Sequence, residues 1–159
     1  MDFRMGFGYD VHRLEEGIPF WLGGVEIQYH KGSLGHSDAD VLLHAICDAL
    51  LGAAALGDIG SHFPDTDPAF KGIASTWLLH KCGELLRSSG YEIGNIDSTV
   101  CLQSPKIKDH IPHMRKQIAR ELGLHTDQVS VKATTEEKLG FTGREEGVSA
   151  YAVVLIKKN

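Results

Sequence analysis

Residues 38–55 are apolar at nearly every position, and their ionisable interruptions recur every four residues, at Asp40, His44 and Asp48. On a helix of about 3.6 residues per turn, this spacing puts the three side chains on one stripe. Neither Lys nor Arg occurs in this segment, and Asp is a poor helix former, so a solvated helix surface explains the stripe badly. We therefore predict a helix over about 38–55, with a capping-box-like start at Ser37 and Asp40, whose stripe faces a polar pocket.

Residues 3–12 alternate between apolar side chains and a second set that contains two glycines and two ionisable residues, which predicts a β-strand. The apolar face consists of Phe3, Met5, Phe7, Tyr9 and Val11, and the other face of Gly6, Gly8, Asp10 and His12. Asp10 and His12 project from one face two residues apart, a spacing that suits two ligands of one metal ion. The glycines leave room for another segment to lie against the strand. If that segment is the helix that carries His44, three ligands converge.

The rest of the chain alternates between strand patterns, two further amphipathic helices and one long loop. Strands are predicted on both sides of Gly23-Gly24 within 20–29, and over 95–104, 129–133 and 148–156; helices over 75–89 and 111–122; and a loop over 58–73. This order predicts an α+β fold, a mixed β-sheet with about three helices packed on one side. Because 159 residues are enough for one substantial core, we expect residues 1–159 to form a single catalytic domain.

Charge and composition exclude several classes of partner. The net charge of −5 and the absence of any block of Lys and Arg argue against nucleic acid. No apolar run approaches about 18 residues and no signal-peptide pattern opens the chain, so we expect no membrane insertion and a cytoplasmic location. Cys47, Cys82 and Cys101 lack CxxC spacing and stand among apolar neighbours, so we expect reduced thiols in the core.

Asp10, His12 and His44 make up a ligand set typical of a catalytic zinc site, in which three protein ligands leave a fourth position open. The same oxygen and imidazole donors also admit manganese or iron. A net-acidic protein without a basic cluster needs such cations, or backbone N–H groups, to hold a phosphate-rich substrate. The residues by themselves therefore predict metal-assisted chemistry without specifying the reaction.

Five blocks, in order along nearly the whole chain, resemble the 2-C-methyl-D-erythritol 2,4-cyclodiphosphate synthase family: GYDVHRL, GHSDADVLLHAICDALLGAAALGDIG, FPDTDPAFKG, PKIKDHIPHMR and KATTEEKLGFTGREEG. The resemblance implies a homotrimeric zinc enzyme of non-mevalonate isoprenoid biosynthesis, with active sites between subunits. It also implies a cytidine diphosphate-linked substrate, 4-diphosphocytidyl-2-C-methyl-D-erythritol 2-phosphate, which is cyclised with release of CMP. The enzyme is then a phosphorus–oxygen lyase.

Taken residue by residue, the resemblance implies that Asp10, His12 and His44 bind one zinc ion per chain, and that Glu137 holds a second divalent ion, magnesium or manganese. The implied substrate-binding residues are Asp58 and Gly60 at the ribose; Lys106, Ala133, Thr134 and Thr135 at the cytidine; and His36, Ser37 and Asp65 at the methylerythritol phosphate. Phe141 and Arg144 fall where the family has an apolar cavity near the trimer axis, and we include them as candidate binding residues.

Four residues are the candidates for a catalytic role: Asp48, Asp58, Thr135 and Glu137. Asp48 lies one helical turn beyond His44, where we expect it to support the imidazole by a hydrogen bond. Attack of the 2-phosphate on the β-phosphorus joins two anions, so the main barriers are charge repulsion and alignment. Because the substrate supplies its own nucleophile, the lack of a Ser/His/Asp or Cys/His arrangement is consistent with this reaction.

Two other functions use the same three ligands. In a zinc phosphohydrolase, hydroxide at the open position attacks an ester, and solvent oxygen enters the product. In a non-catalytic binding module, the metal only stabilises the fold. The second alternative leaves the sequences around Asp58, Lys106 and Glu137 without a role.

Overall fold

The computed structural model describes residues 2–159, and it contains one five-stranded sheet in the order β4-β1-β7-β5-β6. The strands are β1 (Phe3–Glu16), β4 (Lys31–Ser33), β5 (Tyr91–Cys101), β6 (Val129–Thr134) and β7 (Gly147–Lys158). β5 and β6 run parallel, and the other neighbouring pairs run antiparallel. The predicted α+β fold with a mixed sheet is confirmed.

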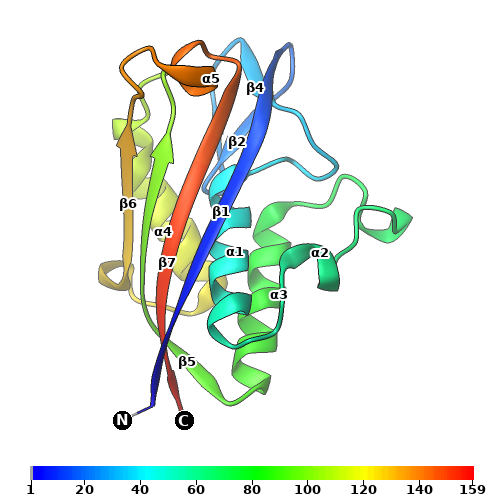
Figure 1. Cartoon of the computed structure of the whole chain (residues 1–159), viewed down its shortest axis with the longest axis vertical. Helices are drawn as coiled ribbons and strands as arrows, with labels where there is room; N and C mark the ends of the chain where they lie inside the picture. Colours follow the sequence, from blue (N-terminus) through cyan, green and yellow to red (C-terminus); the bar gives the residue numbers. More distant parts are fainter. Residues whose placement is uncertain (1) are drawn as a thin grey trace.

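Three long helices cover one face of this sheet (Figure 1). They are α1 (Val41–Ala53), α3 (Ser75–Ser88) and α4 (Ile111–Leu122). The core between the layers includes the fully buried side chains of Leu42, Ile46, Leu79, Met114 and Ile118. The prediction of about three helices on one side is therefore confirmed for the long helices. None of the helices in residues 2–159 has the length and apolar character needed to cross a membrane.

Several short elements connect the long strands and helices. They are the β2 (Phe20–Leu22) and β3 (Val25–Ile27) hairpin, the helices α2 (Ile59–His62) and α5 (Gly140–Gly143), and the 3-10 turns η1 (Pro68–Phe70), η2 (Lys108–His110) and η3 (Thr126–Gln128). The sequence predicted two strand segments about Gly23-Gly24 as either a hairpin or a bulged strand, and they form the hairpin, whereas β4 and α5 were not predicted. A three-residue strand and a four-residue helix are too short for a hydrophobic period to reveal them.

Helix α1 lies directly on the backbone of β1 because two glycines there carry no side chain. A Cβ atom at Gly6 would lie 1.9 Å from the carbonyl oxygen of Ala49, and one at Gly8 would lie 1.9 Å from that of Ala45. No other residue fits at either position without moving the helix. Since side chains alternate along a strand, Asp10 and His12 follow the glycines on this same face. The expectation that strand and helix pack together is thus confirmed.

The opposite face of the sheet is apolar and uncovered within the chain. On β1, the exposed fractions are 48% for Phe3, 76% for Met5 and 63% for Phe7. Tyr151 and Val153 extend this surface onto β7, where they remain 41% and 44% exposed. Contiguous exposed apolar surfaces of this kind mark interaction sites. We call this set of five residues the apolar sheet face.

The start of α1 differs from the prediction. The helix begins at Val41, and Asp40, not Ser37, is its N-cap, accepting the Leu43 N–H. Asp40 also accepts the N–H groups of Gly23 and Gly24, at 2.9 and 2.7 Å, and its side chain is fully buried. The prediction that Asp40 faces a polar pocket is therefore wrong. An acidic residue that caps a helix and anchors a second segment resembles a pocket residue in sequence, because both interrupt an apolar run.

The predicted strand and helix boundaries are otherwise close to the observed ones. The strand predicted over 3–12 extends to residue 16, where it pairs with β4, and the strand predicted over 95–104 spans 91–101. The predicted loop 58–73 contains α2 and η1. All three cysteines are buried free thiols, as predicted.

Candidate functional site

The side chains of Asp10 and His12 on β1 and of His44 on α1 converge at one point. Asp10 Oδ2 lies 2.9 Å from His12 Nε2 and 3.1 Å from His44 Nδ1, and the two nitrogens are 3.2 Å apart. The three side chains are between 14% and 26% exposed. We call this arrangement the triad; among the described residues it is the one cluster of three or more such side chains with the spacing of metal ligands.

Hydrogen bonds on the outer sides of both imidazoles hold the triad in place. His12 Nδ1 lies 3.1 Å from the carbonyl oxygen of Leu34 and donates its hydrogen to it, so Nε2 presents a lone pair to the other ligands. His44 Nε2 lies 2.9 Å from Ser75 Oγ and 3.2 Å from Ser37 Oγ. Ring orientation by a second hydrogen bond is the usual arrangement of metal-binding histidines.

The electrostatics of the triad are dominated by the carboxylate. Burial on its own raises the pKa of Asp10, but the hydrogen bonds and positive charge that His12 and His44 offer when protonated lower that pKa to about 2. For His44, burial lowers the pKa and the Asp10 carboxylate raises it, with a net increase. The site therefore keeps a carboxylate anion next to two imidazoles and favours positive charge between them.

The spacing of the triad fits a small transition-metal ion. Ligands at about 2.0–2.1 Å from a tetrahedral zinc ion lie about 3.3 Å from each other, close to the separations observed here. Two facing imidazole nitrogens and a carboxylate oxygen are also the donors that zinc takes in catalytic sites. The residues present thus fit a zinc ion with one position left for a substrate atom.

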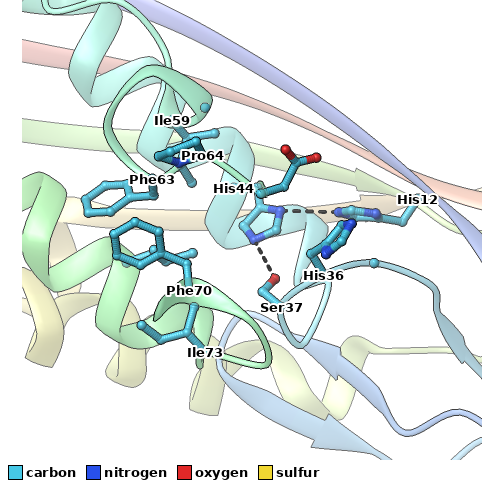
Figure 2. Close-up of a pocket in the computed structure, with 13 residues that line it drawn as sticks. His12, His36, Ser37, His44, Ile59, Phe63, Pro64, Phe70 and Ile73 are labelled. Atoms are coloured by element: carbon cyan, nitrogen blue, oxygen red, sulfur yellow. Dashed lines mark hydrogen bonds between the residues drawn. The ribbon is translucent and has the colours of Figure 1, made fainter. Parts of the chain in front are cut away.

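A cavity of about 400 Å³ opens beside the triad. Figure 2 shows Phe63, Phe70 and Ile73 on one side of it and His36 on the other, with His44 between them. The residues of the cavity are His12, Gly35, His36, Ser37, His44, Ile59, Gly60, Phe63, Pro64, Asp65, Phe70, Ile73 and Leu78. The structure therefore brings four predicted site residues, His36, Ser37, Gly60 and Asp65, together with two ligands of the triad.

Asp48 and Asp58 meet at the start of α2, next to this cavity. Asp48 Oδ1 accepts the N–H of Ile59 at 2.8 Å, and Asp58 Oδ1 accepts both the N–H and the hydroxyl of Ser61. Burial raises the pKa of Asp48, and the charge of Asp58 adds to that rise. The hydroxyl of Ser61 lowers the pKa of Asp58, which is fully exposed. We expected Asp48 to support the His44 imidazole by a hydrogen bond. The hydroxyls of Ser37 and Ser75 lie next to that ring instead.

A second, smaller cavity of about 170 Å³ lies at the ends of β5 and β6. Lys106, Ala133, Thr134 and Thr135, the residues that the family resemblance implied for cytidine binding, all line it. Glu137 follows on an exposed turn, where its N–H lies 3.5 Å from Thr135 Oγ1 and its φ is +52°. Residues 132–140 are all exposed.

The two cavities lie apart across the strands of the sheet within one chain. Asp10 pairs with Ala150, Ala150 with Val100, and Val100 with Ala133, so the triad and the second cavity are three strands apart. Three strand spacings amount to about 14 Å. The residues predicted to bind one substrate therefore form two separate groups in this chain.

Phe141 and Arg144 line neither of these two cavities. Phe141 is 40% exposed on α5, and Arg144 forms an ion pair with Glu146 at 2.9 Å. Arg144 lines a third cavity of about 450 Å³ together with Arg13 and Lys31. The structure does not group these two residues with the rest of the predicted site.

Sequence reasoning missed Asp38 and Ser75. Asp38 precedes α1, and Ser75 is the first residue of α3 and is completely buried. Their side chains are hydrogen-bonded to each other, and Ser75 contacts His44. The available signal was weak, because a serine at a helix start is most often only a cap.

The chain is similar to known proteins over almost its full length. The YgbB family model matches residues 3–157. The 2-C-methyl-D-erythritol 2,4-cyclodiphosphate synthase of Porphyromonas gingivalis is 62% identical over 154 residues, which are 97% of this chain and 95% of that protein.

Solved structures show the same fold. The CDP complex of IspF from Plasmodium falciparum superposes with a TM-score of 0.87 at 35% identity, covering 99% of this chain and 97% of that one. The bifunctional IspDF of Campylobacter jejuni matches with a TM-score of 0.96 at 46% identity and covers 99% of this chain. The chain spans 43% of the length of that bifunctional protein.

Proposed function

This chain belongs to the YgbB family, and we propose that it converts 4-diphosphocytidyl-2-C-methyl-D-erythritol 2-phosphate to 2-C-methyl-D-erythritol 2,4-cyclodiphosphate with release of CMP. It is a phosphorus–oxygen lyase of isoprenoid precursor biosynthesis. The observation that carries the proposal is the triad of Asp10, His12 and His44 at the edge of a cavity of about 400 Å³. A similar protein forms a complex with CDP, which supports a cytidine diphosphate-linked substrate.

Asp10, His12 and His44 would hold zinc, and Glu137 would hold magnesium or manganese when substrate is present. When bound, these cations supply positive charge that offsets the repulsion between the two phosphates that must meet. Asp10 contributes a carboxylate that stays ionised, since its pKa is held near about 2 by the two rings. An exposed carboxylate such as Glu137, with no second acidic ligand proposed, suits an ion held mainly by substrate phosphates and water.

The chain's polar residues bind and align the substrate. Asp58 Oδ1 accepts hydrogens from Ser61, which leaves Oδ2 to accept hydrogens from the ribose hydroxyls, next to Gly60. Ser37 and His36 offer hydroxyl and imidazole donors, and Asp65 an acceptor, to the methylerythritol phosphate part. Alignment is the main contribution, because the attacking phosphate and the leaving CMP belong to one molecule.

The second cavity would hold the cytidine. Lys106 supplies a cation, and Thr134 and Thr135 supply hydroxyls and N–H groups, at a cavity of about 170 Å³. Asp48, Asp58, Thr135 and Glu137 would then surround the phosphates from both cavities. None of these residues needs to act as a nucleophile.

The active enzyme in this proposal is a homotrimer with its sites between subunits. Two observations support it: the two cavities are three strands apart in one chain, and the apolar sheet face is uncovered. Closed rotational symmetry would let a cytidine cavity of one subunit face the triad of the next, while the apolar sheet faces meet at the axis. Phe141 and Arg144 would then lie near that axis. A cytoplasmic location is part of the same proposal, since all three cysteines are free thiols.

The decisive experiment incubates the protein with the diphosphocytidyl substrate, zinc and magnesium in ¹⁸O-labelled water. We expect CMP and a cyclic diphosphate, with no label in either product, by mass spectrometry. Label in CMP or in a linear phosphate product would instead establish the zinc phosphohydrolase. Tight metal binding with unchanged substrate would establish the binding module.

A further inference from the structure

Asp38 and Ser75 form a hydrogen-bonded pair behind His44, on the side of the ring away from Asp10. Ser75 Oγ donates to Asp38 Oδ1, and the N–H of Ser75 donates to Asp38 Oδ2 at 3.0 Å. Ser75 Oγ also lies 2.9 Å from His44 Nε2 and, at the longer distance of 3.5 Å, near Ser37 Oγ. We propose that this pair positions His44 for metal binding, by forcing Nε2 to carry the hydrogen and leaving the Nδ1 lone pair for the metal. The inference rests on the zinc site proposed above.

The direction of each hydrogen bond follows from the donor inventory. An ionised carboxylate only accepts, so the single hydroxyl hydrogen of Ser75 is directed to Asp38. Ser75 Oγ can then only accept from His44, which requires a hydrogen on Nε2. Neutral imidazole has one hydrogen, so Nδ1 is left with its lone pair toward Asp10 and His12.

Asp38 is itself held so that it cannot turn away. Besides the two donations from Ser75, Asp38 Oδ1 accepts the N–H of Asp40 at 3.3 Å, and the Asp38 N–H donates to the carbonyl of Ile73. The N-cap residue of α3, Ala74, makes no side-chain cap, so Asp38 supplies the acceptor for this helix start from another segment. The start of α3 is therefore coupled to the orientation of a metal ligand on α1.

Ser37 is the alternative partner, and three observations favour Ser75. Ser37 Oγ is farther from His44 Nε2, at 3.2 Å, and it already accepts the N–H of Ala39. It also lines the cavity, whereas Ser75 is completely buried. The Ser37 hydroxyl thus remains available to donate to the substrate, and the Ser75 hydroxyl is the hydrogen-bond partner of the His44 ring.

The test measures zinc affinity by competition with a chelator, in the absence of substrate. We expect Ser75→Ala to weaken zinc binding by about 10–100-fold, the usual range for a partner of a ligating imidazole. Asp38→Asn should weaken it at least as much, because the amide can donate to Ser75 Oγ and redirect the hydroxyl hydrogen to Nε2. Ser75→Thr, which keeps the hydroxyl, should restore most of the affinity. Ser37→Ala is the matched control and should leave zinc affinity within about twofold.

A second readout is insensitive to general destabilisation. In zinc-loaded protein labelled with ¹⁵N-histidine, the Nε2–H of His44 should give a slowly exchanging proton signal. That signal should exchange rapidly in Ser75→Ala and persist in Ser37→Ala. Unchanged zinc affinity and unchanged exchange in Ser75→Ala would overturn the proposal, and losses that follow Ser37→Ala would assign the role to Ser37. Failure of the unaltered protein to bind zinc would defeat the proposed function, and the same exchange comparison between metal-free variants would then test the pair separately.

Discussion

The triad and the second cavity are built in different ways. Each triad side chain is at most 26% exposed and comes from the interior of a long strand or helix. The second cavity is lined by the exposed residues Ala133, Thr134 and Thr135, at and just after the end of β6, and Glu137 follows on a turn. One region is organised before any ligand arrives. The second cavity is open, and we expect a surface of another subunit to complete it.

This contrast separates two tasks that a phosphoryl-transfer site must perform. Metal ligands need positions held within fractions of an ångström, and rigid elements provide them. A nucleotide must enter and leave, and an open edge allows that. If the contrast is correct, a substitution in the triad should abolish activity without affecting the rest of the protein. The effect of a substitution that acts on the second region should instead vary with assembly or with the magnesium concentration.

The largest effect is expected from His44→Ala. It removes a triad ligand without touching the apolar sides of α1, so the protein should fold but lose zinc. Activity should fall by at least about a thousandfold, since metal charge is worth several kcal/mol in the transition state. Metal analysis, circular dichroism and CMP release measure this. His80→Ala, a half-exposed histidine on α3, is the control and should keep normal zinc content.

Phe7→Glu should impair the second region indirectly, by disrupting the assembly that we expect to complete it. Phe7 lies on the apolar sheet face and is 63% exposed, on the side of β1 away from the triad. Three carboxylates brought together at a trimer axis repel by several kcal/mol, so activity at low protein concentration should drop by about a hundredfold. Zinc content per chain should not change.

Light scattering should show a smaller species for Phe7→Glu, and His113→Glu, on the exposed side of α4, should remain the size of the unaltered protein. A fully active monomer would contradict a site shared between subunits.

Glu137→Gln should sharpen the distinction between the two metals. Removing the anchoring charge should raise the magnesium concentration needed for half-maximal turnover by about tenfold, while the dialysed protein keeps about one zinc per chain. Glu136→Gln is the matched control, because Glu136 is an exposed carboxylate on the same segment and is not assigned to the second ion. Loss of zinc from Glu137→Gln, or an unaltered magnesium dependence, would remove Glu137 from the proposed second site.

The smallest effect on activity is expected from Asp40→Asn. The amide nitrogen would face one of the N–H groups of Gly23, Gly24 or Leu43, leaving a buried donor without an acceptor. Such a group costs about 1–3 kcal/mol, measurable as a lower free energy of unfolding in urea. Hydrogen exchange should increase at the β2–β3 hairpin and the start of α1, and not at β6. An equal increase at β6 would show that the two regions are not independent.

The long elements were predictable because their hydrophobic periods are regular. Alternation over 3–12 identified both the ligand face and the apolar sheet face, and the apolar run after Asp40 identified α1. The triad followed once strand and helix were paired. Asp40 shows where such reasoning fails: the same spacing of four placed it with His44, but a buried cap and a pocket ligand are distinguished only by tertiary contacts.

The hydrogen-bond partner of His44 was not predictable for a similar reason. Asp48 was the nearest carboxylate along the helix, yet the ring is held by serines from the loop before α1 and from α3. A contact across 31 residues leaves no local pattern. The division of the predicted binding residues into two cavities also required the strand order, since Lys106 and Ala133 cannot be placed relative to Asp10 without it.

The two glycines of β1 also limit the size of the ion that the triad can accept. Because α1 touches the strand backbone at Gly6 and Gly8, no flexible side chain lies between the two elements to absorb a change in their separation. The distance from His44 to Asp10 and His12 is therefore set by contact between main chains. A cation with longer ligand bonds, such as calcium at about 2.3–2.6 Å, would have to push a helix away from a sheet in order to bind. Discrimination by ionic radius thus originates outside the ligands themselves, at two positions that carry no side chain.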